Sequence, residues 1–416
     1  MRKDFQPFWR RGSRIFEGNN ILGDESMVDV AVIGVGQTKY GAFPERDMKG
    51  LFVEAFMEAI ADVQKGIDPK EIQEAFIGTL ETGGNQLGNV AALMTEQAGI
   101  PHIPASRVEN ACCSSGFAFR DALLAIKAGI YGIVMAGGVE KMTDLPRERN
   151  RYWLGVSGDV EWERLAGTNF PGIYAMIALR HMHKYGTKKE QITGVAVKNH
   201  RNAAKNPKAQ LPFEITLERA MNSPILAYPL TLFDACPTTD GASLAILCRA
   251  ELAKDFTDTP IYVVGSGAAS DYLAIHDRKD ITRLTAATLA AKQAYEQAGL
   301  KPEDIDVAEV HDCFTIAEIL AYESLGFAKE GEGGRLITEG ATEIGGRIPV
   351  NPSGGLKAKG HPIGATGVGQ IYEIVHQLRG DATAKERQVK NPEVGLTHNV
   401  GGSGGTAVVH ILKRAL

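Results

Sequence analysis

The sequence predicts an α/β protein built from two similar halves, with a further segment inserted in the first half. Short apolar strands alternate with helical stretches along the chain, which is typical of α/β folds with largely parallel sheets. The chain also repeats itself. KGIDPKEIQEAFIG (65–78) is matched by AGLKPEDIDVAEVH (298–311), with glycine, proline and isoleucine at one constant offset. A duplicated α/β fold accounts for both observations.

Three further correspondences follow in the same order. The strand VIGVG (32–36) resembles VVGSG (263–267). A strand, a turn bearing cysteines and a helix in the first half correspond to a strand, a turn bearing a histidine and a helix in the second. Finally, GIVMAGGVEKM parallels VGLTHNVGGSGG. If the halves pack face to face, the reactive turns at the carboxyl ends of their strands meet at the seam, where α/β proteins usually bind ligands.

These repeats predict the domain organisation. The first half covers residues 28–275 and contains an inserted loop domain at about 145–235, which we expect to cover the site. The second half covers residues 276–416. Residues 1–27 form an N-terminal extension, because Met27 stands directly before the first predicted strand.

Composition and charge exclude several classes of protein. A chain of 416 residues usually folds as two or more domains. The net charge of -5 gives no support for binding nucleic acid. No apolar run reaches the roughly 18–20 residues that span a membrane, and the basic N-terminus lacks the apolar stretch of a secretory signal. Five cysteines without a CxxC pair indicate reduced thiols and not a disulfide framework or a zinc ribbon. We therefore expect a cytoplasmic protein.

Two turns, one of small residues and one rich in glycine, carry the strongest signs of chemistry. NACCSSG (110–116) places two cysteines directly before an apolar helix, whose N-terminus lowers the pKa of a thiol. The alternative is a buried structural pair of cysteines. GHPIGATG (360–367) fixes a tight turn that can hold His361 rigidly while the backbone approaches a ligand. A structural histidine is the alternative there, although the density of glycine and the matching position in the repeat disfavour it.

Two more turns complete the predicted site. HDCF (311–314) ends a strand with His311 and Cys313, which can face one pocket if the chain leaves the strand in a turn. HNVGGSGG (398–405) ends the last predicted strand in a glycine-rich turn and can expose backbone N–H groups to an oxyanion. Taken alone, this second turn could be only a β-turn.

Together these motifs resemble the thiolase family, in its branch of sterol-carrier-protein thiolases and archaeal acetoacetyl-CoA thiolases. NACCSSG, AGGVEKM, HDCF, GHPIGATG and the terminal glycine turn follow the order of the family, and KNHRNAAKNP and CPTTDGAS also look like this branch. The resemblance runs from about Val28 to the C-terminus. It implies the thiolase fold, a five-layered αβαβα core of two duplicated halves with an inserted loop domain.

The resemblance also implies roles for individual residues. Cys113 takes the position of the nucleophile, which leaves Cys112 as a structural neighbour. His361 matches the histidine that takes the proton of the nucleophile and then helps to bind the thioester oxygen. His311 belongs to the oxyanion site for the enolate. The backbone N–H groups of Cys113 and Gly401 form a second oxyanion hole.

One departure from the family concerns the acid/base. Most thiolases carry a second catalytic cysteine in a CxG motif, but Asn399, Val400 and Gly401 stand there in this chain. The branch points to Cys313 instead, provided that its neighbours lower its pKa somewhat from about 8.5. Asn399 has no titrating proton near neutral pH, so we expect it to contribute little.

The function implied is a reversible Claisen condensation, or CoA-dependent thiolysis of a 3-oxoacyl-CoA, through an acyl-cysteine. CoA is then a substrate, held by a loop near Ser266, and no bound cofactor or metal is expected. The substrate could be acetoacetyl-CoA, or a longer or aromatic 3-oxoacyl-CoA such as benzoylsuccinyl-CoA. Aromatic side chains in the predicted insertion could line an acyl pocket or belong to the core; these are Trp153, Trp162, Phe170 and Tyr174.

Three other functions stay open: a decarboxylating ketoacyl synthase, a thiolase-like aldolase, and a catalytically silent scaffold that binds acyl-CoA or lipid. AGGVEKM and the proline of GHPIGATG favour a thiolase over the synthase, and the presence of Cys113 and Cys313 disfavours the aldolase. The resemblance further implies a homodimer or a dimer of dimers. It also implies a small zinc-ribbon/OB-fold partner protein.

Overall fold

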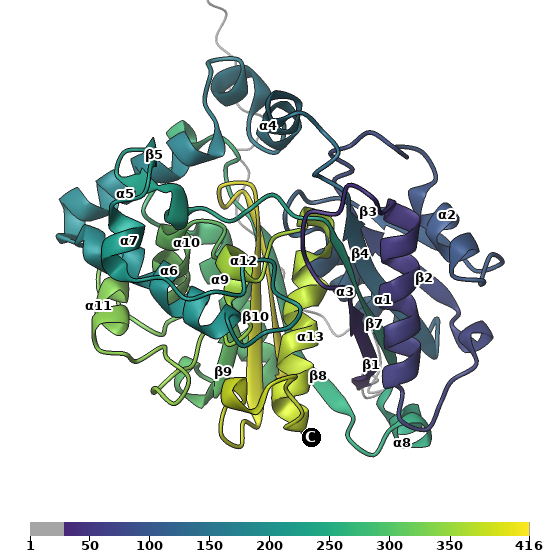
Figure 1. Cartoon of the computed structure of the whole chain (residues 1–416). Helices are drawn as coiled ribbons and strands as arrows, with labels where there is room; N and C mark the ends of the chain where they lie inside the picture. Colours follow the sequence, from purple (N-terminus) through teal and green to yellow (C-terminus); the bar gives the residue numbers. More distant parts are fainter. Residues whose placement is uncertain (1–28, 416) are drawn as a thin grey trace, which may run out of the picture.

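The computed structural model describes residues 29–415, which form two sheet halves surrounded by helices (Figure 1). The strands of the first half are β1 (Val30–Gln37), β2 (Glu74–Gly78), β3 (Ala105–Val108), β4 (Ile133–Glu140) and β7 (Gly241–Arg249). Those of the second are β8 (Ile261–Ser270), β9 (Val307–Glu309), β10 (Val394–Gly401) and β11 (Thr406–Lys413). The predicted extension, residues 1–27, lies outside the described residues.

The pairing of the strands repeats from one half to the other. In the first half β1 pairs antiparallel with β7, β7 antiparallel with β4, and β4 parallel with β2, which pairs parallel with β3. In the second half β8, β11, β10 and β9 pair in the same senses. In the second half, a single parallel bridge between Ala308 and Val350 takes the place of the β2–β3 pairing of the first half. The prediction of a duplicated α/β chain is confirmed. The prediction of largely parallel sheets holds for the strand directions, since four of the five strands of the first half and three of the four of the second run the same way. Only β7 and β11 run antiparallel, each beside the first strand of its half.

Thirteen α-helices are described in residues 29–415. Those that pack on the sheets or follow them are α1 (Met48–Asp62), α2 (Val90–Gln97), α3 (Ser114–Lys127), α8 (Ala253–Phe256), α9 (Thr285–Ala298), α10 (Thr315–Ser324), α11 (Gly333–Thr338), α12 (Gly355–Ala358) and α13 (Thr366–Arg379). Those of the predicted insertion are α4 (Arg147–Gly155), α5 (Phe170–Tyr185), α6 (Lys189–Ala203) and α7 (Leu217–Met221).

Three buried clusters show how these elements are layered. One lies between α1, α2 and the first half of the sheet, and another lies between the second half and α9 and α10. The third joins both halves through α3 and α13, with side chains such as Phe119 and Val368 between the strands. Helices therefore cover both outer faces and also fill the space between the two sheet halves. This is the five-layered αβαβα core that the resemblance implied.

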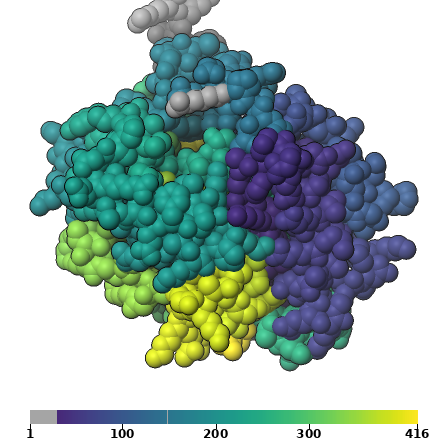
Figure 2. Space-filling model, in the orientation of Figure 1, coloured from purple at the N-terminus to yellow at the C-terminus, as the bar shows by residue number. Residues whose placement is uncertain are grey.

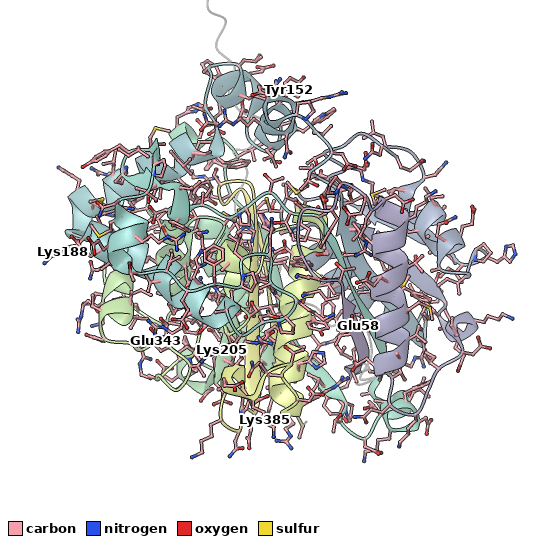
Figure 3. All side chains as sticks on the ribbon, viewed as in Figure 1. Glu58, Tyr152, Lys188, Lys205, Glu343 and Lys385 are labelled. Atoms are coloured by element: carbon pink, nitrogen blue, oxygen red, sulfur yellow. The ribbon has the colours of Figure 1, made fainter. Side chains whose placement is uncertain are left out.

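The predicted insertion at 145–235 is mostly helical. Besides α4 to α7 it contains one π-helical turn, η2 (Val160–Arg164), and a small sheet of β5 (Ile225–Ala227) and β6 (Leu230–Thr231). In Figure 2 this teal segment covers much of one face and meets the purple first half along a seam. Its surface is mixed: charged side chains such as Lys188 and Lys205 are exposed to solvent (Figure 3), and so are large apolar side chains such as Leu165 and Ile225.

The boundary between the halves stays a prediction. The partners of β8 favour a boundary before this strand and not after residue 275: β8 pairs with β11 from Tyr262 to Ser270, but with β1 only at Ile261 and Tyr262. Within residues 29–415, no helix combines the length and the apolar character needed to cross a lipid bilayer.

Candidate active site

The cysteine turn joins β3 to α3, as the sequence predicted. Cys113 is the N-cap of α3, and the chain reaches it through Ala111, whose backbone is left-handed with φ of 49°. The turn is tied by Ser114, whose hydroxyl donates to the Ala111 carbonyl at 2.6 Å and accepts from the Asn110 N–H at 3.0 Å. Because the left-handed residue turns the chain sharply, the Cys112 sulfur lies near His311 and His361, whereas the Cys113 sulfur lies near Thr406.

The histidine turn joins α12 to α13 and lies against the first half of the sheet. Gly364 makes this approach possible, because a Cβ there would lie 2.7 Å from the carbonyl oxygens of both Gly78 and Val139. Its N–H donates to the buried carboxylate of Glu140 at 3.0 Å. The second half thus places His361 directly beside the strand ends of the first.

The structure brings Cys112, His311 and His361 together. The Cys112 sulfur and one ring nitrogen of each histidine lie within 4.8 Å of one another, and all three residues are buried. The two imidazole rings meet edge to face, with centroids 5.1 Å apart. Nucleophile, base and hydrogen-bond donor could therefore act on one small group at this point.

Hydrogen bonds determine which nitrogen of His361 carries the proton. The Thr366 hydroxyl donates to the Pro362 carbonyl at 2.9 Å, so it accepts from His361 Nδ1 at 2.7 Å. The proton is therefore on Nδ1. Nε2 has no hydrogen-bond partner and keeps a lone pair. Burial lowers the pKa of His361 to about 3, so the ring is neutral near pH 7 and can accept a proton at Nε2.

His311 is held from the other side by Asn399. The Asn399 amide nitrogen lies 3.1 Å from His311 Nδ1 and also donates to the Cys112 carbonyl at 3.2 Å. Burial, with the neighbouring His361 and His398, holds the pKa of His311 well below its usual value. Its Nε2 is buried and has no hydrogen-bond partner.

Cys113 does not belong to this group. Its side chain is fully buried, and its sulfur contacts the Asn110 carbonyl at 3.0 Å and the Thr406 hydroxyl at 3.1 Å, on the side of β11. The prediction that Cys113 is the nucleophile and Cys112 a structural neighbour disagrees with this geometry. Because the two cysteines are adjacent, an offset of one residue in matching the motif exchanges their roles.

The expected oxyanion donors shift by one residue in the same way. The Cys113 N–H is occupied within the turn, where it donates to the Asn110 carbonyl at 3.1 Å. The backbone N–H groups of Cys112 itself and of Gly402 lie beside the Cys112 sulfur, where they act to lower its pKa. Gly401, the predicted donor, instead leaves room for Cys113, because a Cβ there would lie 3.0 Å from its sulfur.

Cys313 lies beside the group but not within it. Its sulfur is adjacent to the Tyr174 hydroxyl, and the Tyr174 ring stacks on Phe314 with centroids 4.6 Å apart. Burial first, then the neighbouring Cys236 and Cys112, raise the pKa of Cys313 well above its usual value. Burial likewise raises the pKa of Cys112 to about 12. The expectation that helix and neighbours lower these values is wrong for the free protein, because loss of solvent outweighs the nearby donors.

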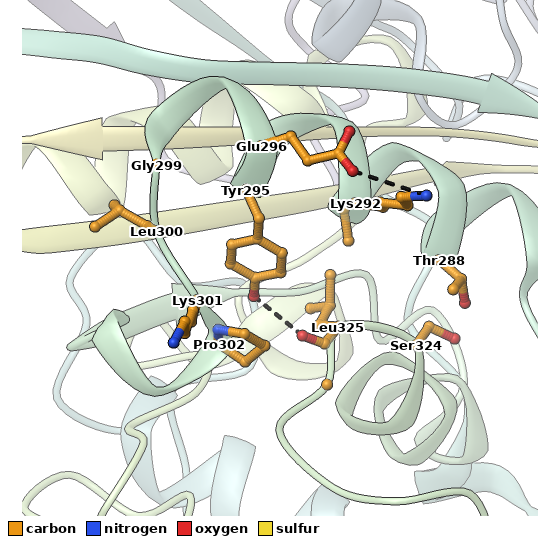
Figure 4. A pocket seen from close by; sticks show the side chains of 12 residues that line it. Thr288, Lys292, Tyr295, Glu296, Gly299, Leu300, Lys301, Pro302, Ser324 and Leu325 are labelled. Carbon is orange, nitrogen blue, oxygen red and sulfur yellow. Dashed lines mark hydrogen bonds and ion pairs between the residues drawn. The ribbon is translucent and has the colours of Figure 1, made fainter.

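The other predicted residues lie in different places. Ser266 is in β8, where its N–H donates to the Gln297 side chain at 2.9 Å. Of the four aromatic residues in the insertion, Tyr174 is buried beside Cys313, whereas Trp162 is 68% exposed and packs on His276. A surface groove of about 480 Å³ between α9 and the end of α10 is lined by Tyr295 and Leu300 among others, and contains none of the three grouped side chains (Figure 4).

Two buried acids that the sequence analysis did not single out hold the turns in place. Asp312 accepts from the N–H groups of Leu356 and Lys357 at the start of α12, at 2.6 and 3.1 Å. Glu140 accepts from Leu80, Thr82 and Gly364. Both lie inside quoted motifs, HDCF and AGGVEKM. Their position within motifs that carry reactive side chains is the sequence signal that could have identified these acids as residues that order the loops around the site.

Known proteins confirm the family. The description "Thiolase, N-terminal domain" matches residues 27–251, and "Thiolase C-terminal domain-like" matches residues 267–414. The acetyl-CoA acetyltransferase of Methanothermobacter thermautotrophicus is 49% identical over 389 residues, covering 93% of this chain and 100% of that protein. The benzoylsuccinyl-CoA thiolase subunit BbsB of Thauera aromatica is 35% identical, with 90% and 94% covered. A solved structure titled "Ltp2-ChsH2(DUF35) aldolase" superposes with a TM-score of 0.80 at 28% identity, covering 93% of this chain and 98% of that one. The chain belongs to the thiolase family and is an acyltransferase.

Proposed function

We propose that this thiolase catalyses the reversible condensation of two acyl-CoA molecules to a 3-oxoacyl-CoA and free CoA, with Cys112 as the nucleophile. The observation that carries the proposal is the buried group of Cys112, His311 and His361, whose reactive atoms lie within 4.8 Å of one another. The proposal revises the expectation for Cys113, whose sulfur faces β11.

In the first stage Cys112 attacks the carbonyl of an acyl-CoA. Its thiol proton passes to Nε2 of His361, which carries a lone pair because Nδ1 donates to Thr366. Transfer to a neighbouring base during attack suits a thiol whose pKa is about 12, since little thiolate exists beforehand. The oxyanion meets the N–H groups of Cys112 and Gly402. When the intermediate collapses, CoA leaves as the thiol with the proton from His361.

In the second stage a base removes a proton from the carbon next to the carbonyl of a second acyl-CoA. We assign this step to Cys313. The enolate oxygen then accepts a hydrogen bond from the Nε2–H of His311, and the carbanion attacks the acyl group on Cys112. The bond to Cys112 breaks, and its sulfur takes the proton that Cys313 removed from the substrate, so that Cys313 returns to the thiolate. The reverse sequence is thiolysis by CoA, and the concentrations of the metabolites determine the direction.

Acetyl-CoA is the substrate that the relatives favour, since the Methanothermobacter protein is named an acetyl-CoA acetyltransferase. The name of the Thauera protein keeps a larger aromatic substrate, benzoylsuccinyl-CoA, in consideration. Thiolysis of acetoacetyl-CoA, a long-chain 3-oxoacyl-CoA and benzoylsuccinyl-CoA can be followed by the loss of each 3-oxoacyl-CoA. We expect the highest kcat/KM with acetoacetyl-CoA. A preference for the aromatic compound would contradict the assignment.

The decisive test of the nucleophile compares two adjacent variants. After incubation with acetyl-CoA, mass spectrometry of the intact protein should show an added acetyl group in the wild type and in Cys113→Ala, but none in Cys112→Ala. Peptide mapping should place this group on Cys112. Acetylation that persists in Cys112→Ala and disappears in Cys113→Ala would return the role to Cys113.

We further propose a cytoplasmic homodimer or dimer of dimers. All five cysteines are free thiols, which suits a reducing compartment. The half-exposed strand β3 is one edge of the large sheet and could pair with a second copy. A small zinc-ribbon/OB-fold partner is proposed from the resemblance to the branch. Light scattering of the purified protein, alone and with co-expressed candidate partners, tests both ideas.

A further inference from the structure

Asn399 occupies the position where most thiolases have their second catalytic cysteine. The nitrogen of its side-chain amide contacts the site, whereas the amide oxygen is buried without a hydrogen-bond partner. Asn399 is 2% exposed and lies at the end of β10. Its amide nitrogen reaches two atoms, the Cys112 carbonyl oxygen at 3.2 Å and His311 Nδ1 at 3.1 Å. The residue thus contacts both the proposed nucleophile and the proposed oxyanion donor.

The surroundings allow only one orientation of this amide. A carbonyl oxygen accepts hydrogen bonds and cannot donate them, so the NH₂ group must be the end that faces the Cys112 carbonyl. The amide oxygen points into a slot between α3 and α13. There, a Cβ at Gly116 would lie 2.8 Å from this oxygen and a Cβ at Gly367 only 2.5 Å. Two glycines thus leave just enough room for the oxygen.

This orientation decides the state of His311. Because the group facing Nδ1 is a donor, Nδ1 must be the unprotonated nitrogen of the neutral ring, and the proton must be on Nε2. His361 is held in the opposite state by Thr366, with its proton on Nδ1 and a lone pair on Nε2. The two histidines therefore present one donor and one acceptor to the same small space.

We propose that Asn399 is a positioning residue that keeps the proton of His311 on Nε2, where it donates to the enolate oxygen of the second substrate. The inference rests on the proposed function of the site. The same orientation also works against metal binding at Cys112, His311 and His361. A histidine that binds Zn²⁺ through Nε2 needs an acceptor, not a donor, at its Nδ1–H.

Two variants separate this role from simple packing. Asn399→Asp keeps the shape of the side chain but offers His311 Nδ1 an acceptor, so the proton should move to Nδ1. Asn399→Ala removes both donor and acceptor, so the two forms of the ring should coexist. We expect condensation to fall in the order wild type, Asn399→Ala, Asn399→Asp. The Asp variant should lose about 10²–10³-fold in kcat, as when one oxyanion donor is removed. If Asn399 only fills space, the nearly isosteric Asp variant should be the more active of the two.

The state of His311 can be measured without turnover. In protein labelled with ¹⁵N-histidine, the signals of His311 are those absent from His311→Gln. We expect a protonated Nε2 in the wild type and in Asn222→Asp, an exposed control with the same change of charge, and a protonated Nδ1 in Asn399→Asp. The Asp variant should also bind Co²⁺ at least about 10-fold more tightly than the wild type. A protonated Nδ1 in the wild type, or faster condensation by the Asp variant than by the Ala variant, would overturn the inference. Failure of Cys112 acetylation would instead count against the proposed function alone.

Discussion

Burial dominates the chemistry of the Cys313 thiol. The side chain is 6% exposed, and its pKa lies well above the usual value, so the thiol is protonated near pH 7. A thiol of this kind is a weak acid, and its thiolate is a correspondingly strong base. If Cys313 moves the proton of the second substrate, condensation should become faster as pH rises above 7, because the thiolate fraction grows.

This role predicts a selective defect in Cys313→Ala. Acetylation of Cys112 should continue, since it depends on His361, whereas condensation should fall by about 10²–10⁴-fold with the loss of the acid/base. Rapid-quench measurement of acetylation and a steady-state assay of acetoacetyl-CoA formation separate the two steps. Tyr174→Phe, which removes the neighbouring hydroxyl but keeps the stacked ring, is the matched control and should have a smaller effect. Condensation by Cys313→Ala at nearly the wild-type rate would leave His311 or a water molecule as the base.

At the scale of elements, the short helix α12 depends on Asp312. The carboxylate accepts from two N–H groups at the start of α12 and from the Asn199 amide at 2.6 Å, and so links the HDCF turn to the helix that precedes His361. Asp312→Ala leaves these buried donors unpaired, so we expect a loss of stability of about 1–3 kcal/mol.

The same change should displace His361 and slow acetylation of Cys112, although Asp312 has no assigned role in the acetylation step. Asp312→Asn keeps one acceptor and should lie between the wild type and the Ala variant in both properties. Urea unfolding curves and acetylation rates of the three proteins test this order. If Cys112 of the Asp312→Ala variant is acetylated at the wild-type rate, α12 is held in place without the carboxylate.

At the scale of the whole molecule, α3 and α13 join the two halves through glycine. A Cβ at Gly367 would lie 2.3 Å from the Gly116 nitrogen, so Gly367→Ala should force the helices apart and cost about 1–3 kcal/mol. Gly172→Ala is the control, because a Cβ at this helical position would make only an ordinary contact at 3.5 Å. Thermal unfolding should show a lower Tm for the first variant and an unchanged or higher Tm for the second. Equal Tm values would contradict a tight junction.

Buried neutral histidines should make the protein sensitive to acid. Burial lowers the pKa of His410 to about 4, whereas an unfolded histidine has a pKa near 6.5. The unfolded chain therefore binds more protons between these values, and stability present above pH 6.5 is lost as the pH falls toward 4. His410→Gln can keep the hydrogen bond to the Gly116 carbonyl. Between pH 7 and pH 4.5 we expect the wild type to lose roughly 2–3 kcal/mol more stability than this variant, as measured from Tm. Equal losses of stability in the two proteins would contradict a lowered pKa of His410.

The sequence could predict the duplicated fold because glycines, prolines and apolar strands recur at one offset, and it could predict His361 and His311 because rigid turns hold them. It could not predict which cysteine faces them. That depends on the left-handed Ala111, and nothing in NACCSSG indicates this conformation. Nor could it predict the role of Asn399, which depends on the contact of a strand from the second half with a turn from the first. The reversed direction of β7 and β11 could not be predicted either, because apolar strands show no direction in the sequence.

The division of the site between the two halves has a consequence for the newly made protein. Cys112 leaves the ribosome long before His361, and the turn that carries the base packs only when the second half has folded. Until then the thiol lacks its proton acceptor, and acyl-CoA in the surroundings cannot readily acylate an incomplete chain. The Cys112 thiol thus becomes reactive only when the native structure has formed. A truncated or misfolded copy therefore consumes few of the thioesters around it.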